Sequence, residues 1–162
     1  MFNKIQKVVE GQFKLDLFSD HGVHHWKRVE KIGLYLSKDM NVDEEVIKLF
    51  ALLHDSKREN ELVDPEHGSR AGIYAKELYK RKFLPITEEQ LYELVFACTN
   101  HSNSESVTDN LTINICWDSD RLDLWRVGIT PDPKYLKTEA AKNNEALTYS
   151  YNLYYKNNVY DN

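Results

Sequence analysis

The feature that most constrains the fold is the spacing of the apolar residues, which recur mostly at intervals of three and four. That spacing puts them on one face of an α-helix, whereas the strict alternation of a half-buried strand is rare in this chain. The first stretches with such an apolar stripe are residues 2–14, 22–38 and 43–55. The pattern predicts an all-α fold, a helical bundle of about six to seven helices.

Side chains that cap helices indicate where several of these helices begin. The predicted starts are Asn41 with Glu44 for the third helix, Asp64 with Pro65 for the fourth, a capping box of Thr87 and Gln90 for the fifth, and a position near Thr138 for the last. A sixth helix is expected over about residues 110–127, and Pro131 and Pro133 require a loop after it.

Length and composition favour one soluble domain over residues 1–162, with its core at about 18–133 and a terminal helix packed on it from each end. The chain has 162 residues, of which 41% are apolar and 29% charged. Its opening stretch, MFNKIQKVVEGQF, is broken by charge, and no apolar run approaches the roughly 18 residues of a transmembrane helix. Cys98 and Cys116 lie in apolar helical surroundings, which favours a reducing, cytoplasmic setting over a disulfide framework.

The charge balance narrows the class of partner. A formal net charge of -5 gives no electrostatic footprint for duplex nucleic acid. It does not exclude small phosphorylated ligands, because a local basic pocket can form on an acidic protein. Four tyrosines near the C-terminus, Tyr149, Tyr151, Tyr154 and Tyr155, indicate either helix packing or the face of a homodimer.

Five of the expected helices carry a titratable side chain on the inward face, at one end of the apolar stripe. Each of these residues lies four positions from an apolar residue of its own helix; they are His25, His54, His67, His101 and Asp120. A buried carboxylate is costly unless it is paired or bound to a metal, and a buried imidazole needs a partner. The pattern therefore predicts that these side chains converge on a metal ion.

The order of these residues resembles a known family. The segments HxxRV at His25, HD at His54 and SDRLD at Ser119 follow one another as in the HD-domain superfamily, a helical superfamily of mostly metal-dependent phosphohydrolases. The resemblance runs from about His21 to Pro133, and HGVHHWKRV and RVGITPDPKYL look like a bacterial subgroup of that superfamily.

The resemblance implies a set of metal ligands. Those of the first ion would be His25, His54, Asp55 and Asp120, and His67 and His101 stand where members with two metals add a second pair. The glycine that some members carry four residues after the first of these two histidines is Ala71 here. Mn, Fe, Co, Ni, Zn and Mg are not distinguished by such ligands.

Further residues are candidates for catalysis or substrate binding. Asp120, Arg58 and Glu59 are the candidate catalytic residues, and Arg58, Arg28, Arg70, Lys134 and His21 are the candidate substrate contacts. Three of these residues also have a purely structural explanation. Arg58 can pair with Glu59, Glu59 can be a solvated loop charge, and Arg28 can form a salt bridge to Asp123. Asp118 is a rival to Asp120, but lies about 200° from it around a helix.

These observations favour a divalent-metal-dependent phosphohydrolase that acts on a small phosphorylated molecule, such as a nucleotide. Two alternatives stay open. The same six residues would serve a di-iron oxygenase of the HD type, and a non-catalytic module would bind a nucleotide and signal through a partner.

Overall fold

The computed structural model describes residues 2–156, and every regular element in that part of the chain is helical. The limits expected for the domain at residues 1 and 162 lie outside the described residues. The elements are α1 (Phe2–Glu10), α2 (Val23–Leu36), α3 (Glu44–Leu53), α4 (His67–Lys80), α5 (Glu88–Asn100), α6 (Leu111–Arg121), the 3₁₀ turns η1 (Leu124–Val127) and η2 (Pro133–Tyr135), α7 (Glu139–Lys142) and α8 (Asn144–Tyr155). The all-α prediction is confirmed.

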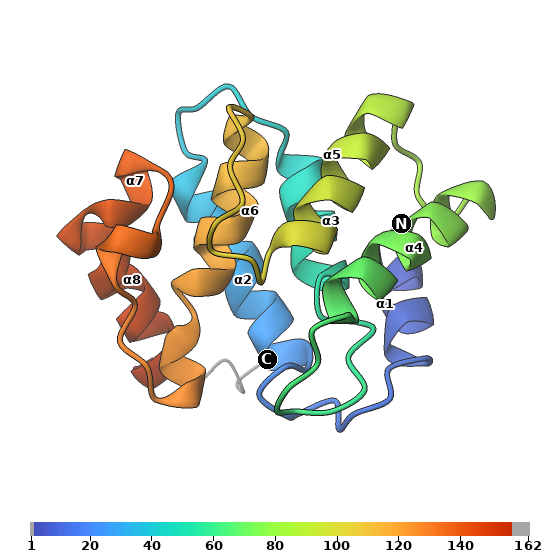
Figure 1. Cartoon of the computed structure of the whole chain (residues 1–162), viewed down its shortest axis with the longest axis horizontal. Coiled ribbons are helices and arrows are strands. Elements are labelled where there is room, and N and C mark those ends of the chain that lie inside the picture. The colour runs from blue at the N-terminus through green and yellow to red at the C-terminus, as the bar shows by residue number, and fades with distance from the viewer. Residues whose placement is uncertain (1, 157–162) are drawn as a thin grey trace.

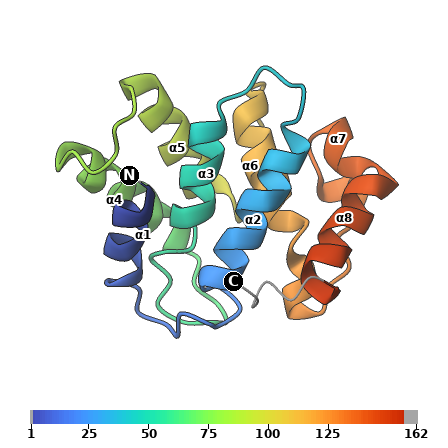
Figure 2. The ribbon, with the colours of Figure 1, turned by 180° about the vertical axis from the view of Figure 1, so that it is seen from behind.

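Three helices form the centre of the bundle. Helix α2 packs against α3 and α6, α4 and α5 pair on one side, and α7 and α8 lie on the other (Figures 1 and 2). The core is continuous across these layers and includes Phe50 and Trp117, both fully buried. None of the helices in the described part combines the length and the apolar character needed to cross a bilayer.

The helix count exceeds the expected six to seven because the chain beyond residue 110 is more broken than its apolar pattern indicates. The helix expected over residues 110–127 ends at Arg121 and continues only as η1. At this break the side chain of Asp123 turns toward α2, where Arg28 and His25 bind its carboxylate. Thr138 caps the short α7, and α8 follows from Asn144.

Two predicted helix starts are wrong by two or three residues. Helix α3 is capped by Asp43 and not by Asn41, since the Asp43 carboxylate accepts hydrogen bonds from the first-turn amides. Helix α4 begins at His67, because Asp64 uses its carboxylate to bind Arg70. The capping box of Thr87 and Gln90 at the start of α5 is confirmed.

Tyrosines of α8 pack inside the molecule. Tyr149 stacks on Tyr35 of α2 with the ring centroids 4.1 Å apart. The guanidinium of Arg28 lies 5.1 Å from the ring centroid of Tyr154. Tyr151 and Tyr155, in contrast, are 40% and 52% exposed.

The close approach of α4 to α5 depends on small residues. A Cβ atom on Gly68 would lie 2.6 Å from the carbonyl oxygen of Cys98, and one on Gly72 would lie 2.5 Å from the Thr99 hydroxyl. Ala71 lies between these glycines and is fully buried. This contact holds the start of α4 against the end of α5, where His67 and His101 meet.

We predict that Gly68→Ala destabilises the protein. A helical Gly→Ala change alone adds about 0.5–1 kcal/mol of stability, but the forced shift of α4 away from α5 should cost about 1–3 kcal/mol. Urea unfolding followed by circular dichroism measures the difference, with Ser69→Ala on the same helix as control. A Gly68→Ala protein at least as stable as the wild type would contradict the packing argument.

Candidate metal centre

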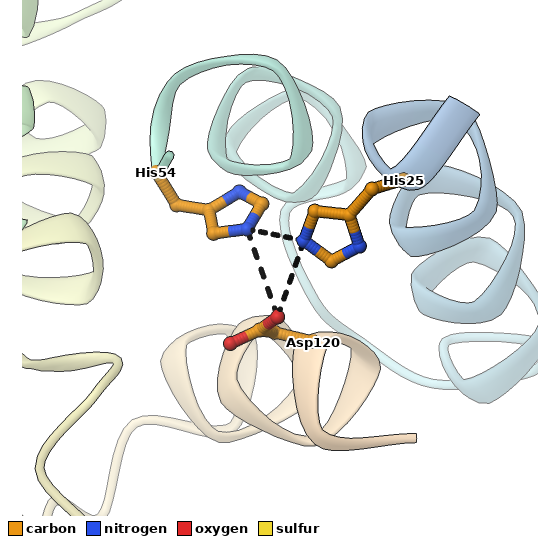
Figure 3. Close-up of side chains that lie close together, drawn as sticks. All are labelled: His25, His54 and Asp120. Atoms are coloured by element: carbon orange, nitrogen blue, oxygen red, sulfur yellow. Dashed lines mark hydrogen bonds and ion pairs between the residues drawn. The ribbon is translucent and has the colours of Figure 1, made fainter. Parts of the chain in front are cut away.

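Three helices and the turn after α3 bring the first group of polar side chains together. His25 of α2, His54 at the end of α3 and Asp120 of α6 point toward one another (Figure 3). The His25 Nε2 atom lies 3.0 Å from His54 Nε2 and 3.4 Å from Asp120 Oδ1, and Asp55 Oδ2 lies 3.5 Å from His25 Nε2. Two ligand atoms about 2.1 Å from one ion are roughly 3 to 3.5 Å apart, so the four atoms have the spacing of a metal site.

A second group adjoins the first through Asp55. The His67 Nε2 atom lies 2.9 Å from His101 Nε2, and both face Asp55 Oδ1, at 3.2 and 3.5 Å respectively. The two oxygens of one carboxylate thus face two different histidine pairs. The rings of His54 and His101 are 5.0 Å apart at their centroids, so the groups form one continuous cluster.

Each of the four clustered histidines is held by a contact between its Nδ1 atom and a hydrogen-bond acceptor. The acceptors are the carbonyl oxygens of Phe50 and Ala51 for His54, Asp64 for His67 and Cys98 for His101, and a carboxylate oxygen of Asp123 for His25. Because a carbonyl oxygen only accepts hydrogen bonds, Nδ1 must carry the proton in each neutral ring. The lone pair of each neutral ring is then on Nε2 and faces the centre of the cluster.

The centre of the cluster lacks the hydrogen-bond donors that its carboxylates need. Asp55 Oδ1 and Asp120 Oδ1 are both buried and have no hydrogen-bond partner within the described residues. Such orphaned acceptors are costly, and a bound cation would satisfy them together with the imidazole lone pairs. The residues present therefore fit one or two divalent ions.

The pKa shifts in the metal-free cluster also indicate that it favours a bound cation. Burial and the charge of Arg126 lower the pKa of His25, but the adjacent carboxylates of Asp120, Asp123 and Asp55 outweigh them and raise the pKa to about 9. Burial raises the pKa values of Asp55 and Asp120, but the surrounding imidazoles outweigh it and hold both well below the usual range. Both carboxylates are therefore ionised, and they attract a proton to the cluster when no other cation is bound.

The ends of the helices position this cluster. His54 and His101 are the residues that follow α3 and α5, His67 is the first residue of α4, and Asp120 lies in the last turn of α6. At a helix end the backbone leaves carbonyls free of helical partners, and the carbonyls of Ala51 and Cys98 accept from His54 and His101.

Asp120 and not Asp118 reaches the cluster. Asp118 is fully buried on another face of α6, where its carboxylate accepts hydrogen bonds from the backbone amides of Lys137 and Thr138 and from the Thr138 hydroxyl. It thereby fixes the segment that precedes α7.

Two of the other predicted residues lie beside the cluster. Arg58 places its Nη1 atom 3.6 Å from Asp55 Oδ1 and 3.4 Å from His67 Nε2. His21 is buried at the start of α2, where its Nδ1 contacts Glu61, and burial lowers the pKa of His21. The His21–Glu61 contact joins the loop before α2 to the loop after α3, which lie side by side in Figures 1 and 2.

Arg28 has a structural partner. Its Nε and Nη2 atoms donate to the two oxygens of Asp123, at 2.6 and 3.0 Å. This bidentate pair is buried, and it holds Arg28 on the Nδ1 side of His25 rather than on the Nε2 side that faces the cluster. Of the two interpretations of Arg28, a substrate contact and a salt bridge to Asp123, the structure shows the salt bridge.

Three predicted residues lie away from the cluster. The side chain of Glu59 is 48% exposed and pairs with Lys14. Arg70 donates hydrogen bonds to the Asp64 carboxylate and to the backbone carbonyl of Lys57, so its guanidinium lies against the loop after α3. Lys134 is 64% exposed and pairs with its neighbour Asp132. The structure brings none of these three side chains to the six clustered residues.

Sequence reasoning missed one residue of the site and the full role of another. Arg126 of η1 lies 3.6 Å from Asp120 Oδ1, but it follows the end of α6, where helical spacing carries no information. Asp123 was expected only as a partner of Arg28, yet it also holds His25. A usable signal was present: His25 and Arg28 lie three apart on one helix face, and both need an acceptor.

We predict that the stability of the metal-free protein depends on pH through His25. Its folded pKa of about 9 exceeds the unfolded value of about 6.5, so its contribution is complete below pH 6.5 and is lost as the pH rises through 9. The loss should be on the order of 3 kcal/mol, measured by urea unfolding in a chelator at pH 6 and pH 9.5. His25→Gln should flatten this dependence and His24→Gln should retain it. A wild-type profile that is already flat would show that His25 is neutral in the cluster.

Comparisons with known proteins were consistent with this geometry. No family model and no curated protein matches the sequence. Among solved structures, the chain is similar to the crystal structure of a predicted HD superfamily hydrolase from an uncultured Thermotogales bacterium. The TM-score is 0.69 at 27% identity, and the match covers 92% of this chain and 84% of the other. This likeness, the all-helical fold and the order His, His-Asp, Asp along the helices support the resemblance of the chain to the HD-domain superfamily.

Proposed function

We propose that the protein is a divalent-metal-dependent phosphohydrolase that acts on a small phosphorylated molecule. The observation that carries this proposal is the cluster itself, in which the Nε2 atoms of four histidines face two buried carboxylate oxygens that have no hydrogen-bond partner within the described residues. The likeness to a predicted HD superfamily hydrolase supports hydrolysis as the reaction.

The residues divide into two sets of ligands. His25, His54, Asp120 and Asp55 Oδ2 would hold the first ion, and His67, His101 and Asp55 Oδ1 the second. A divalent ion bound in this way lowers the pKa of a coordinated water and polarises a phosphoryl oxygen.

Two side chains would act on the substrate. Asp120 is at the edge of the cluster, with 15% of its side chain exposed, so its carboxylate can accept a hydrogen bond from the attacking water and orient it. Arg58 would offset the negative charge of the phosphoryl group, because its guanidinium already lies against Asp55. Phosphoryl transfer depends mainly on such positioning and charge stabilisation.

Release of inorganic phosphate from a panel of nucleotides, sugar phosphates and other phosphoesters tests this function. The Mn²⁺-loaded protein should hydrolyse at least one compound, and Asp120→Asn should reduce the rate by about 10²-fold or more. Glu59→Gln is the matched carboxylate control and should retain the rate, whereas loss of a general base would cost about 10²–10⁴-fold. If no phosphoester is hydrolysed with any of the candidate metals, the proposal is wrong.

We predict two steps of metal binding. The second set of ligands has only two histidines of its own, so its ion should bind more weakly than the first. Calorimetric titration of the chelator-treated protein with Mn²⁺ should show both steps, and His101→Ala should remove only the weaker one. His24→Ala, a histidine outside the cluster, is the control. One step in the wild type that His101→Ala leaves unchanged would assign His67 and His101 to substrate contacts.

One alternative draws on the same geometry. A carboxylate facing two histidine pairs would also serve a di-iron oxygenase, because such an enzyme needs two ions held side by side. Oxygen consumption by the iron-loaded protein, without phosphate release from the panel, would favour this alternative.

A further inference from the structure

Arg126 lies at the edge of the cluster and is almost entirely buried. It belongs to η1, and only 7% of its side chain is exposed. Its Nη1 atom donates to the backbone carbonyl of Asp123 at 3.0 Å, and its Nη2 atom lies 3.6 Å from Asp120 Oδ1. The guanidinium is thus anchored on one side and reaches a candidate metal ligand on the other.

Most of the hydrogen-bonding capacity of Arg126 is unused. A guanidinium has five N–H donors, and the contact with Asp123 is the one hydrogen bond that the Arg126 side chain makes within the described residues. Its Nε atom is buried and has no partner there. Arg28, in contrast, donates twice to Asp123, and Arg58 donates to the carbonyls of Asn60 and Leu62. A buried donor group with this much spare capacity indicates a missing acceptor.

Asp120, the clustered residue that Arg126 contacts, is partly exposed. The side chains of His25 and His54 are 0% exposed, and those of Asp55, His67 and His101 are between 3% and 6% exposed. Asp120 is the most accessible of the six, at 15%. A ligand that reaches Asp120 would come close to Arg126, because Arg126 Nη2 lies 3.6 Å from Asp120 Oδ1.

The positive charge of Arg126 would favour the binding of an anion once the carboxylates are bound to cations. In the metal-free protein it sits against the ionised Asp120 and lowers the pKa of that carboxyl further. With cations at Asp120 and Asp55, a third positive charge a few ångströms away is unfavourable unless an anion approaches. An arginine fork with free donors is well suited to the oxygens of a phosphate.

We propose that Arg126 binds the non-bridging oxygens of a terminal phosphoryl group, and that the substrate is accordingly a phosphomonoester rather than a diester. This assignment rests on the proposed function for the identity of the substrate. A terminal phosphoryl group carries up to two negative charges and presents three free oxygens, which match the spare donors of Arg126 beside Asp120 and the charge of Arg58 beside Asp55. A diester carries one charge and has two free oxygens.

Inorganic phosphate is the probe, titrated at pH 8 by calorimetry into the full chain loaded with Mn²⁺. Arg126→Met should weaken phosphate binding about 10- to 100-fold, because hydrogen bonds to charged groups are lost, with the Mn²⁺ content unchanged. Arg126→Lys should restore part of the affinity, since it returns the charge without the fork. Arg81→Met, which removes a guanidinium that lies over Phe83, is the matched control and should bind phosphate as the wild type does. Dimethyl phosphate, a diester anion, should bind the wild type at least 10-fold more weakly than phosphate.

Two outcomes overturn the assignment. If Arg126→Met binds phosphate normally, or loses phosphate binding only in proportion to lost Mn²⁺, Arg126 acts by positioning Asp120. If dimethyl phosphate binds as tightly as phosphate, the preference for a monoester is wrong. These results are separate from the fate of the proposed function: a wild type that binds phosphate through Arg126 but hydrolyses no phosphoester retains the anion site and loses the assigned reaction.

Discussion

The carboxylate of Asp55 links the two halves of the cluster, and the rest of the site is arranged around it. Its two oxygens face different histidine pairs, so the distance between the pairs is set by the width of one carboxyl group. Four helix ends have to meet at this point. The bundle achieves this by packing α2 against α3 and α6 on one side, and by the glycine contact that brings α4 onto α5 on the other.

The histidines are not all held in the same way. The backbone supplies the acceptors for His54, His67 and His101, so their orientation follows from the fold and survives most side-chain changes. His25 depends on Asp123, and Asp123 depends on Arg28. This buried chain of three side chains makes the orientation of His25 sensitive to substitution at positions outside the cluster.

Much of the helical framework and five of the six clustered residues could be predicted from regular spacing along helices, whereas Asp55 was predicted from the resemblance to the HD-domain superfamily. The stripe that carries Val29 and Ile32 also turns His25 inward, and the same phase separates Asp120 from Asp118. Prediction failed where the backbone leaves the helix. Asp123 and Arg126 lie beyond the end of α6, and their positions depend on long-range contacts with α2 and on the short turn η1. Glu59, Arg70 and Lys134 lie away from the cluster because they pair with Lys14, Asp64 and Asp132, and helical spacing does not predict such charge pairs.

The direction of three helices gives the molecule an electrical polarity. Helices α3, α5 and α6 all end at the cluster, so the partial negative charge of each helix dipole lies beside the ligands. The same three helices begin around a pocket that includes Asp43, Glu89 and Glu93, where the positive ends of the dipoles are offset by carboxylates. Helices α2 and α4 begin at the cluster and place two positive ends there, so the three negative ends outnumber them by one and the peptide backbone adds a net attraction for cations at this end of the bundle. At the other end it is balanced, so the field of the helices favours cations where the imidazoles are.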